Sequence, residues 1–296
     1  MRKALRAIGC SVALAVLASR AAFAEPLAWR CEALLCVAIR QTHDDRIVLF
    51  DNRGPIDATV RIVAWPRGIV FRRPPLRELV LAPGQQREAA RFYTETCDEN
   101  IKSELGFEHL LGSQRTVHDD RTRYAFPFGG TQPRRLAAAG EGITHAGALR
   151  FAYDFDLPEG TPVLAARAGT VVQVKDGFHE GGTDPRLASR ANAVVVAHAD
   201  GTVATYGHLR AGVGVRVADC VTTGQRIGES GDTGFSTGPH LHFQVGRIAG
   251  SEEGATLPIR FVGGGAAGLA LEAGRDYGPA REVRPASGSH RSGICR

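Results

Sequence analysis

The chain has 296 residues, a length that suits one large or two modest domains. Its formal charge of +5 falls to +1 without residues 1–24, because that segment contains four Lys or Arg residues and no acid. The remaining chain is nearly neutral, so its charge gives no reason to expect a protein that binds nucleic acid.

Residues 1–24 have the three parts of a secretory signal peptide. Basic residues come first, residues 11–19 form an apolar run too short to span a bilayer, and residues 22–24 form a small-x-small cleavage site. We expect the mature chain to begin at Glu25 and to be exported to a Gram-negative periplasm, since we find no wall-anchoring motif. No later segment is long and apolar enough to predict a transmembrane helix.

The exported chain would keep five cysteines, namely Cys31, Cys36, Cys97, Cys220 and Cys295. Export permits disulfides, and the odd number leaves at least one thiol free or paired outside the chain. Cys31 with Cys36 could close a short hairpin, and Cys220 with Cys295 could hold the C-terminal tail.

Residues 25–94 predict a small β-sandwich-like domain. Turn-forming segments separate its β-rich runs, which are residues 46–50, 58–64 and 77–81. The domain carries no catalytic motif. It could act as a spacer, cover the next domain, or bind an envelope protein partner.

The rest of the chain divides into three parts. Residues 95–141 are mostly polar and charged and predict a connector. Residues 142–262 are β-rich without long helical periodicity, with strand-like runs at 161–165, 169–174, 193–197 and 202–206. Residues 263–296 are rich in Gly, Ala, Arg and Pro and predict an irregular tail. We therefore predict an all-β protein whose second domain is an antiparallel β-sheet.

Two histidines, His240 and His242, lie one residue apart in a strand-like run. Alternate side chains of a strand point to the same face, so both imidazoles would project from one face and Leu241 from the other. Such a pair can hold a zinc ion, or one imidazole can bind the metal while the other acts beside it. His208 and Asp154, each in a strand-like run of its own, strengthen this interpretation.

The four segments that carry these residues are 151–163, 165–172, 205–209 and 231–243. Their order and spacing resemble the lysostaphin/LytM-type zinc metallopeptidases, and the run Ser-Thr-Gly-Pro-His-Leu-His-Phe at 236–243 is highly specific to that family. The resemblance covers roughly residues 142–262. It implies a compact antiparallel β fold, one Zn²⁺ ion, and hydrolysis of peptide bonds in peptidoglycan. It also implies that Asp154 and His242 are zinc ligands and that His208 and His240 are catalytic residues that do not bind the metal.

The third zinc ligand departs from the family pattern. Most members have a His four residues before the Asp, where this chain has Arg150, which offers no lone pair to a metal. We predict that His145, nine residues before Asp154, is the ligand. Asp156 shares a strand face with Asp154 and is the alternative.

Three other residues have two interpretations each. Tyr206 shares a predicted strand face with His208 and could contact the substrate or pack in the core. His198 lies in a segment that is typical of a hairpin turn, so it could serve the turn or take part in catalysis. His179 lies in a Gly-rich loop that could line a cleft or face solvent.

Two functions from different classes are compatible with these motifs. An active zinc endopeptidase would use metal-activated water, with His208 and His240 sharing the roles of base and oxyanion stabiliser. A catalytically inactive module would instead bind or activate other cell-wall hydrolases, and Arg150 in the usual His position is the reason to consider it. Measurements of the zinc content and of peptide release from peptidoglycan would distinguish the active enzyme from the inactive module.

Overall fold

The computed structural model of the chain describes residues 27–32, 34–65, 68–94, 105–140, 145–249 and 256–278. The predicted signal peptide, Cys97 and Cys295 lie outside these ranges. The described residues form strands and short 3₁₀ helices, which are η2 Gly147–Leu149, η3 Pro185–Arg190 and η4 Gly265–Ala267. None of these helices has the length or apolar character needed to cross a membrane. The prediction of an all-β protein is confirmed.

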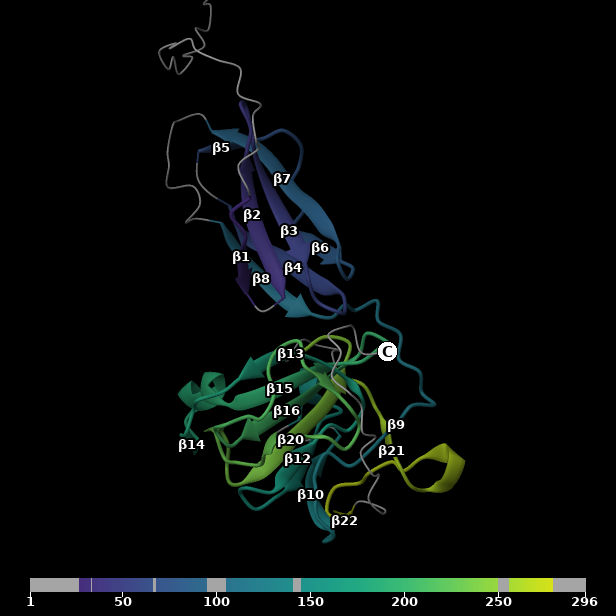
Figure 1. Cartoon of the computed structure of the whole chain (residues 1–296). Coiled ribbons are helices and arrows are strands. Elements are labelled where there is room, and N and C mark those ends of the chain that lie inside the picture. The colour runs from purple at the N-terminus through teal and green to yellow at the C-terminus, as the bar shows by residue number, and fades with distance from the viewer. Residues whose placement is uncertain are drawn as a thin grey trace, which may run out of the picture.

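The N-terminal domain is a sandwich of two antiparallel sheets (Figure 1). One sheet has the order β1-β2-β3-β7-β5 and the other the order β6-β4-β8. The strands are β1 Arg30–Glu32, β2 Leu35–Gln41, β3 Arg46–Asn52, β4 Ala58–Ala64, β5 Ile69–Phe71, β6 Glu78–Leu81, β7 Gln86–Thr94 and β8 Gly106–Leu111. Alternate apolar residues of both sheets face each other, and Phe50, Leu81 and Phe92 are buried between them.

Disulfides are found at two of the predicted positions. Cys31 and Cys36 are bonded across β1 and β2, as predicted. Cys220 is also disulfide-bonded. Its partner lies outside the described residues, so the bond between Cys220 and Cys295 stays a prediction.

The second domain is built on an antiparallel sheet of order β17-β13-β15-β16-β20-β11-β10-β22. Its strands are β10 Arg134–Ala139, β11 Tyr153–Asp156, β13 Gly169–Lys175, β15 Asn192–Ala197, β16 Val203–Leu209, β17 Cys220–Val221, β20 His240–Gly246 and β22 Asp276–Tyr277. Short pairs surround it: β9 Arg123–Tyr124 with β21 Arg260–Phe261, β12 Pro162–Leu164 with β18 Arg226–Glu229, and β14 Gly181–Gly182 with β19 Gly234–Phe235. The main core, which includes Phe155, Tyr206 and Phe243, covers one face of the sheet.

The structure differs from the predicted connector and tail. Strand β8 lies in the predicted connector but pairs with β4 of the sandwich, and β10 lies there too but pairs with β11 of the large sheet. Strand β22 lies in the predicted tail and pairs with β10. These strands are short and lie within stretches rich in charged and polar residues, and that surrounding composition concealed them in the sequence.

The sandwich packs on the large sheet through a small apolar cluster in which Ile56 and Leu111 meet Val195 and Val203. Val203 and Gly207 are four residues apart on β16 and therefore lie on the same face, and Gly207 pairs with His242. The contact therefore lies on the same face of the sheet as the histidine pair, at the other end of the strands. Backbone hydrogen bonds reinforce it, because the Ala249 N–H donates to the Leu111 carbonyl over 2.8 Å.

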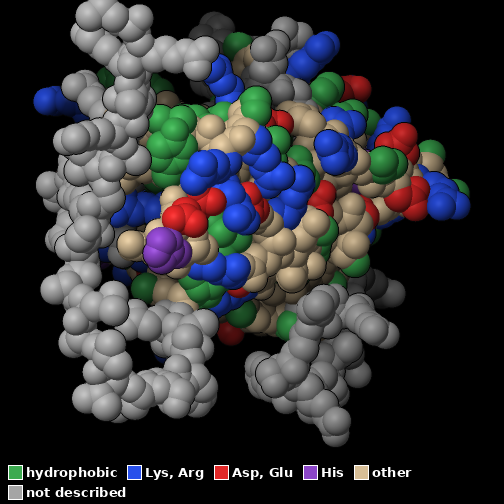
Figure 2. Space-filling view, turned by 90° about the horizontal axis from the view of Figure 1, so that it is seen from above, with side chains coloured by type: hydrophobic (Ala, Val, Ile, Leu, Met, Phe, Trp, Pro, Cys, Tyr) green, Lys and Arg blue, Asp and Glu red, His purple; other side chains and the backbone are tan. Residues whose placement is uncertain are grey.

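The far end of the sandwich carries charges of both signs. Figure 2 looks down on this end and shows Lys and Arg side chains interleaved with acidic ones. Asp45 lies 2.7 Å from Arg72 and 3.8 Å from Arg91, while Glu88 lies 2.8 Å from Arg73. Exposed pairs of this kind contribute little to stability, so we expect this surface to aid solubility rather than to hold the fold.

Candidate metal centre

Strand register brings the central residues of the site together. β11 pairs with β20 so that Asp154 lies opposite His242. On the other side of β20, Gly207 lies opposite His242, and a Cβ at Gly207 would come within 3.3 Å of the His242 Cβ. Burial of Leu241 and Phe243 on the core face fixes this register, because a slip of one residue would expose both.

His145 completes a three-residue cluster from a loop just before η2. Its side chain is only 2% exposed, and its Nε2 lies 2.9 Å from Asp154 Oδ2. One potential ligand atom from each of His145, Asp154 and His242 lies within 4.8 Å of the others. Among the described residues, this is the group of at least three His, Cys, Asp or Glu side chains that is close enough to hold one metal ion.

The cluster fits a zinc ion. Both ring nitrogens of His145 are buried without an aligned hydrogen bond in the described part of the chain, and the close contact with Asp154 does not have hydrogen-bond geometry. A buried polar atom without a partner is costly, and a bound cation would supply the partner. Two imidazole nitrogens and one carboxylate oxygen are a donor set of catalytic zinc sites, which leave a fourth position open.

Both ring nitrogens of His242 are held in place. Nδ1 lies 2.9 Å from Asp154 Oδ1, and Nε2 lies 3.0 Å from Gln244 Oε1. Because an amide oxygen only accepts, Gln244 keeps a proton on Nε2 and leaves Nδ1 for a metal beside Asp154. The sequence analysis missed Gln244, although a residue two positions after His242 must share its strand face.

The charges of this pair stabilise each other. Burial alone would raise the pKa of Asp154, but its contacts with His145 and His242 hold that pKa well below its usual range. Burial alone would lower the pKa of His242, but the hydrogen bond and charge of Asp154 outweigh burial and raise it. The carboxylate is therefore ionised at neutral pH, as a metal ligand must be.

Two further imidazoles lie beside the cluster. The His208 ring is 4.5 Å from the His240 ring and 6.0 Å from the His242 ring, between centroids. His208 Nδ1 lies 2.7 Å from the Thr233 carbonyl, and His240 Nδ1 lies 2.8 Å from the Gly238 carbonyl. A carbonyl only accepts, so each Nδ1 carries the proton and each Nε2 keeps a lone pair. Burial, assisted by His240, lowers the pKa of His208 to about 4.

The backbone of His208 is left-handed, with φ at 58°. In a regular strand His208 would face the same way as Tyr206, which is fully buried in the core and whose hydroxyl accepts the Ala166 N–H over 2.8 Å. The left-handed residue turns the imidazole toward the histidine pair instead. A non-glycine residue in this conformation costs about 1–3 kcal/mol, and such strain clusters at functional sites. Of the two roles considered for Tyr206, the structure shows core packing.

Arg150 and Asp156 take no part in the cluster. Arg150 follows η2, is exposed, and lies over the Phe151 ring at 5.4 Å. Asp156 pairs with His240 in the register of β11 and β20 and is also exposed. The structure thus places His145, rather than either of these residues, beside Asp154 and His242.

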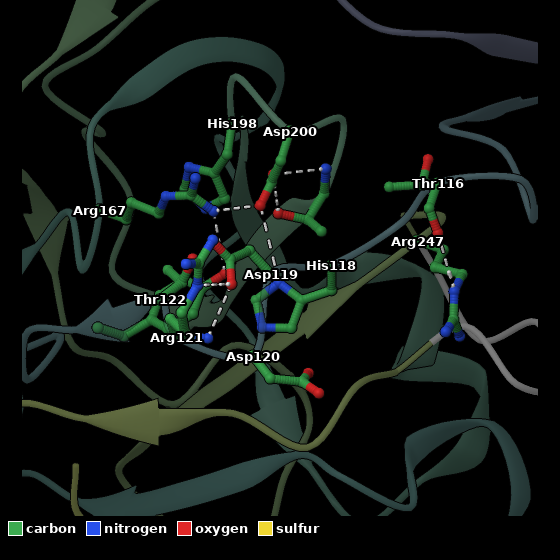
Figure 3. A network of polar contacts seen from close by, with 12 residues as sticks. Thr116, His118, Asp119, Asp120, Arg121, Thr122, Arg167, His198, Asp200 and Arg247 are labelled. Atoms are coloured by element: carbon green, nitrogen blue, oxygen red, sulfur yellow. Dashed lines mark hydrogen bonds and ion pairs between the residues drawn. The ribbon is translucent and has the colours of Figure 1, made fainter. Parts of the chain in front are cut away.

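A second polar network lies at the joint between the domains (Figure 3). Asp200, from the turn between β15 and β16, is 2.7 Å from an Arg167 nitrogen and 3.7 Å from His118 Nδ1. His198 closes the predicted turn, since its N–H donates to the Thr202 carbonyl over 2.8 Å. Its Nδ1 lies 2.9 Å from the Ala168 carbonyl, and burial lowers its pKa to about 4.

We expect the free energy of unfolding to decrease as the pH falls from about 6.5 to about 4, partly through His198. The unfolded chain takes up a proton near the ordinary histidine pKa of 6.5, whereas the folded chain keeps His198 neutral down to about 4. The unfolded state therefore binds more protons in this window, which corresponds to roughly 3 kcal/mol at its acid end. Urea unfolding of the wild type and His198→Asn between pH 4 and 7 measures the effect. Equal pH slopes for the two proteins would contradict this assignment.

Comparison with known proteins adds the family. Residues 149–253 match the profile of peptidase family M23. The peptidoglycan DD-endopeptidase ShyA of Vibrio cholerae is 35% identical over 132 residues, which is 45% of this chain and 26% of ShyA. Lysostaphin of Staphylococcus staphylolyticus is 36% identical over 117 residues, 39% of this chain and 22% of lysostaphin. The DD-carboxypeptidase/endopeptidase Mpg of Neisseria meningitidis is 38% identical over 108 residues, 36% of this chain and 22% of Mpg.

The chain spans about a quarter of the length of these relatives. The matched range contains Asp154, His208, His240 and His242, whereas His145 lies four residues before it. The predicted resemblance is confirmed: over residues 149–253 the chain carries a domain of peptidase family M23.

Proposed function

We propose that this protein is a zinc-dependent endopeptidase that hydrolyses peptide bonds in bacterial peptidoglycan. The observation that carries the proposal is the convergence of His145, Asp154 and His242 within 4.8 Å, next to two imidazoles that do not belong to the cluster. The similarity to the endopeptidases ShyA and Mpg supports the same reaction class.

The residues of the site have two roles, metal binding and proton transfer. His145, Asp154 and His242 would hold the ion, which when bound supplies Lewis acidity to a peptide carbonyl and to a water molecule. His208 and His240 supply proton transfer, because each keeps a lone pair on Nε2 while its Nδ1–H is fixed on a carbonyl. One imidazole can take the proton of the attacking water, and the other can stabilise the oxyanion or protonate the leaving amine.

Export and the N-terminal sandwich complete the proposal. We propose that the protein acts in the periplasm, because residues 1–24 have the composition of a signal peptide. An envelope protein partner for the sandwich stays a prediction. The sandwich lies on the site face of the large sheet, so its position suits a role in limiting which substrates reach that face.

We expect a chelator to abolish the release of peptides from purified peptidoglycan sacculi, and stoichiometric Zn²⁺ to restore it. The physical reason is that the three ligands contribute Lewis acidity only through the ion. Peptide release is measured by chromatography before chelation, after chelation, and after addition of zinc. A zinc-loaded protein that releases no peptide at any pH between 5 and 9 would leave the inactive, hydrolase-activating module as the better reading.

The structure weakens the reason for that alternative. An inactive module was considered because Arg150 stands where most relatives have a histidine. Arg150 is exposed and lies over the Phe151 ring, whereas His145 Nε2 lies 2.9 Å from Asp154 Oδ2. This contact supports the proposal that His145, at a different spacing from the usual family histidine, is the third ligand.

A further inference from the structure

The left-handed backbone of His208 needs support from its neighbours, because a non-glycine residue with φ at 58° persists only where the surrounding structure holds it. Before His208, the strand is held by the pairing of β16 with β20. After it, the Leu209 carbonyl accepts hydrogen bonds from two buried side chains, those of Thr233 and Asn192. These two side chains therefore fix the backbone at the point where the chain leaves His208.

Thr233 holds His208 from two directions. Its hydroxyl donates to the Leu209 carbonyl over 2.8 Å and accepts the Asn192 N–H over 3.0 Å. Its backbone carbonyl lies 2.7 Å from His208 Nδ1. A single residue thus restrains both the imidazole ring and the backbone that follows it, so the orientation of the ring depends on where Thr233 lies.

Asn192, the first residue of β15, completes this arrangement. Its Nδ2 donates to the Leu209 carbonyl over 3.0 Å and to the Phe178 carbonyl over 2.8 Å, and its Oδ1 accepts the Phe178 N–H over 3.0 Å. Both amide hydrogens and the amide oxygen are therefore used. A buried polar network in which each member has its partners is rigid, so it can hold a neighbouring group in one geometry.

The backbone on both sides of Thr233 is packed closely against other segments. A Cβ at Gly231 would lie 2.5 Å from the Arg210 backbone nitrogen, and a Cβ at Gly234 would lie 2.5 Å from the Ala191 Cβ. These approaches are possible only because both residues are glycines. The loop therefore has little room to shift, and the Thr233 carbonyl is presented to His208 in a fixed position.

We propose that Thr233 is a positioning residue for His208, and that its hydroxyl as well as its carbonyl sets the direction of the His208 Nε2 lone pair. The role is indirect, because Thr233 acts through the imidazole. Catalysis depends steeply on such geometry, since a displacement of about 1 Å can cost about 100-fold in rate. This inference rests on the proposed function and identifies a residue that keeps its proton-transfer group in place.

The test compares four zinc-loaded full chains on a soluble cross-linked peptide dimer from peptidoglycan. They are the wild type, Thr233→Val, Thr233→Ser and the control Thr59→Val. Valine replaces the hydroxyl by a methyl group, whereas serine keeps the hydroxyl. Thr59 is buried in the sandwich and its hydroxyl donates to the Gly112 carbonyl over 2.9 Å, so the control loses the same kind of hydrogen bond in the other domain. Thermal unfolding and zinc content are measured on each sample.

We expect Thr233→Val to lower kcat about 10–100-fold with KM within about twofold and zinc content unchanged. Thr233→Ser should keep kcat within about threefold of the wild type, because the hydroxyl is retained. Thr59→Val should lose stability but keep the wild-type kcat. A wild-type kcat in Thr233→Val, or an equal loss of kcat in the valine and serine variants, would overturn the inference. If Thr233→Val does not fold, Thr233→Ala takes its place with the same expected loss.

A wild type that releases no peptide would refute the proposed function instead. Nuclear magnetic resonance of histidine-labelled protein then decides the positioning role separately. The His208 Nδ1–H resonance, assigned by its absence in His208→Ala, should be protected from solvent exchange in the wild type and in Thr233→Ser. It should lose that protection in Thr233→Val, and equal protection in all three proteins would overturn the inference.

Discussion

Replacing His242 by Ala is expected to remove both the metal and the hydrolytic activity. His242 Nδ1 lies 2.9 Å from the Asp154 carboxylate. Without His242, only His145 and Asp154 of the cluster remain, and two ligands are too few to hold the ion. The drop in zinc affinity should exceed the roughly 100-fold that follows loss of an outer partner. Gln244→Ala, which removes the acceptor of His242 Nε2, should by comparison weaken zinc binding about 10–100-fold. Elemental analysis and competition with a zinc indicator measure both variants.

His43→Ala is the matched control, because His43 is 97% exposed and contacts Asp44 at the far end of the sandwich. It should keep full zinc content and activity. If His242→Ala retained one zinc ion per chain with the wild-type affinity, the three-residue metal centre would be wrong. A similar loss in His145→Ala would establish that the displaced histidine is the third ligand.

Replacing His208 is expected to abolish turnover while zinc stays bound. His208 lies beside the cluster and its Nδ1 is fixed on the Thr233 carbonyl, so its loss removes a proton-transfer group and not a ligand. General acid–base groups contribute about 10²–10⁴ in rate, and kcat of His208→Ala should fall by that factor. Peptide release and zinc content, measured on the same sample, separate this effect from metal loss.

The left-handed backbone gives this experiment an internal check. Glycine adopts φ near 58° freely, whereas alanine does not. His208→Gly should therefore be as inactive as His208→Ala but more stable by about 1 kcal/mol. Equal unfolding free energies for the two variants would contradict the strained geometry, and wild-type kcat in either would exclude His208 from catalysis.

Much of the site could be predicted because its chemistry is encoded locally. The alternation of His240, Leu241, His242 and Phe243 requires one polar and one apolar face, and the structure has both. The predicted resemblance covered roughly residues 142–262, which include the range 149–253 that matches family M23. The short disulfide of Cys31 and Cys36 was also predictable, because the two cysteines are only five positions apart in a hairpin.

Other features could not be predicted because they depend on residues that meet only in the folded chain. Part of the predicted connector forms β8 and β10, which pair with strands of the two sheets. Strand pairing needs backbone partners rather than apolar side chains, so the composition did not reveal it. Tyr206 and His208 are two residues apart, so a regular strand would place them on the same face. They face opposite ways because the left-handed backbone of His208 interrupts the strand. The roles of Gln244 and Thr233 could be recognised only in the folded chain, where their oxygens lie within hydrogen-bond distance of the His242 and His208 ring nitrogens.

The sequence by itself determined the all-β class, the paired histidines on one strand face and the family that they indicate, since each depends on residues near one another in the chain. Only the tertiary structure decided that His145 meets Asp154 and that the left-handed His208 lies beside His240 and His242. The physical reason is that strand register and loop packing, not sequence distance, set which donors and acceptors share a water-poor space.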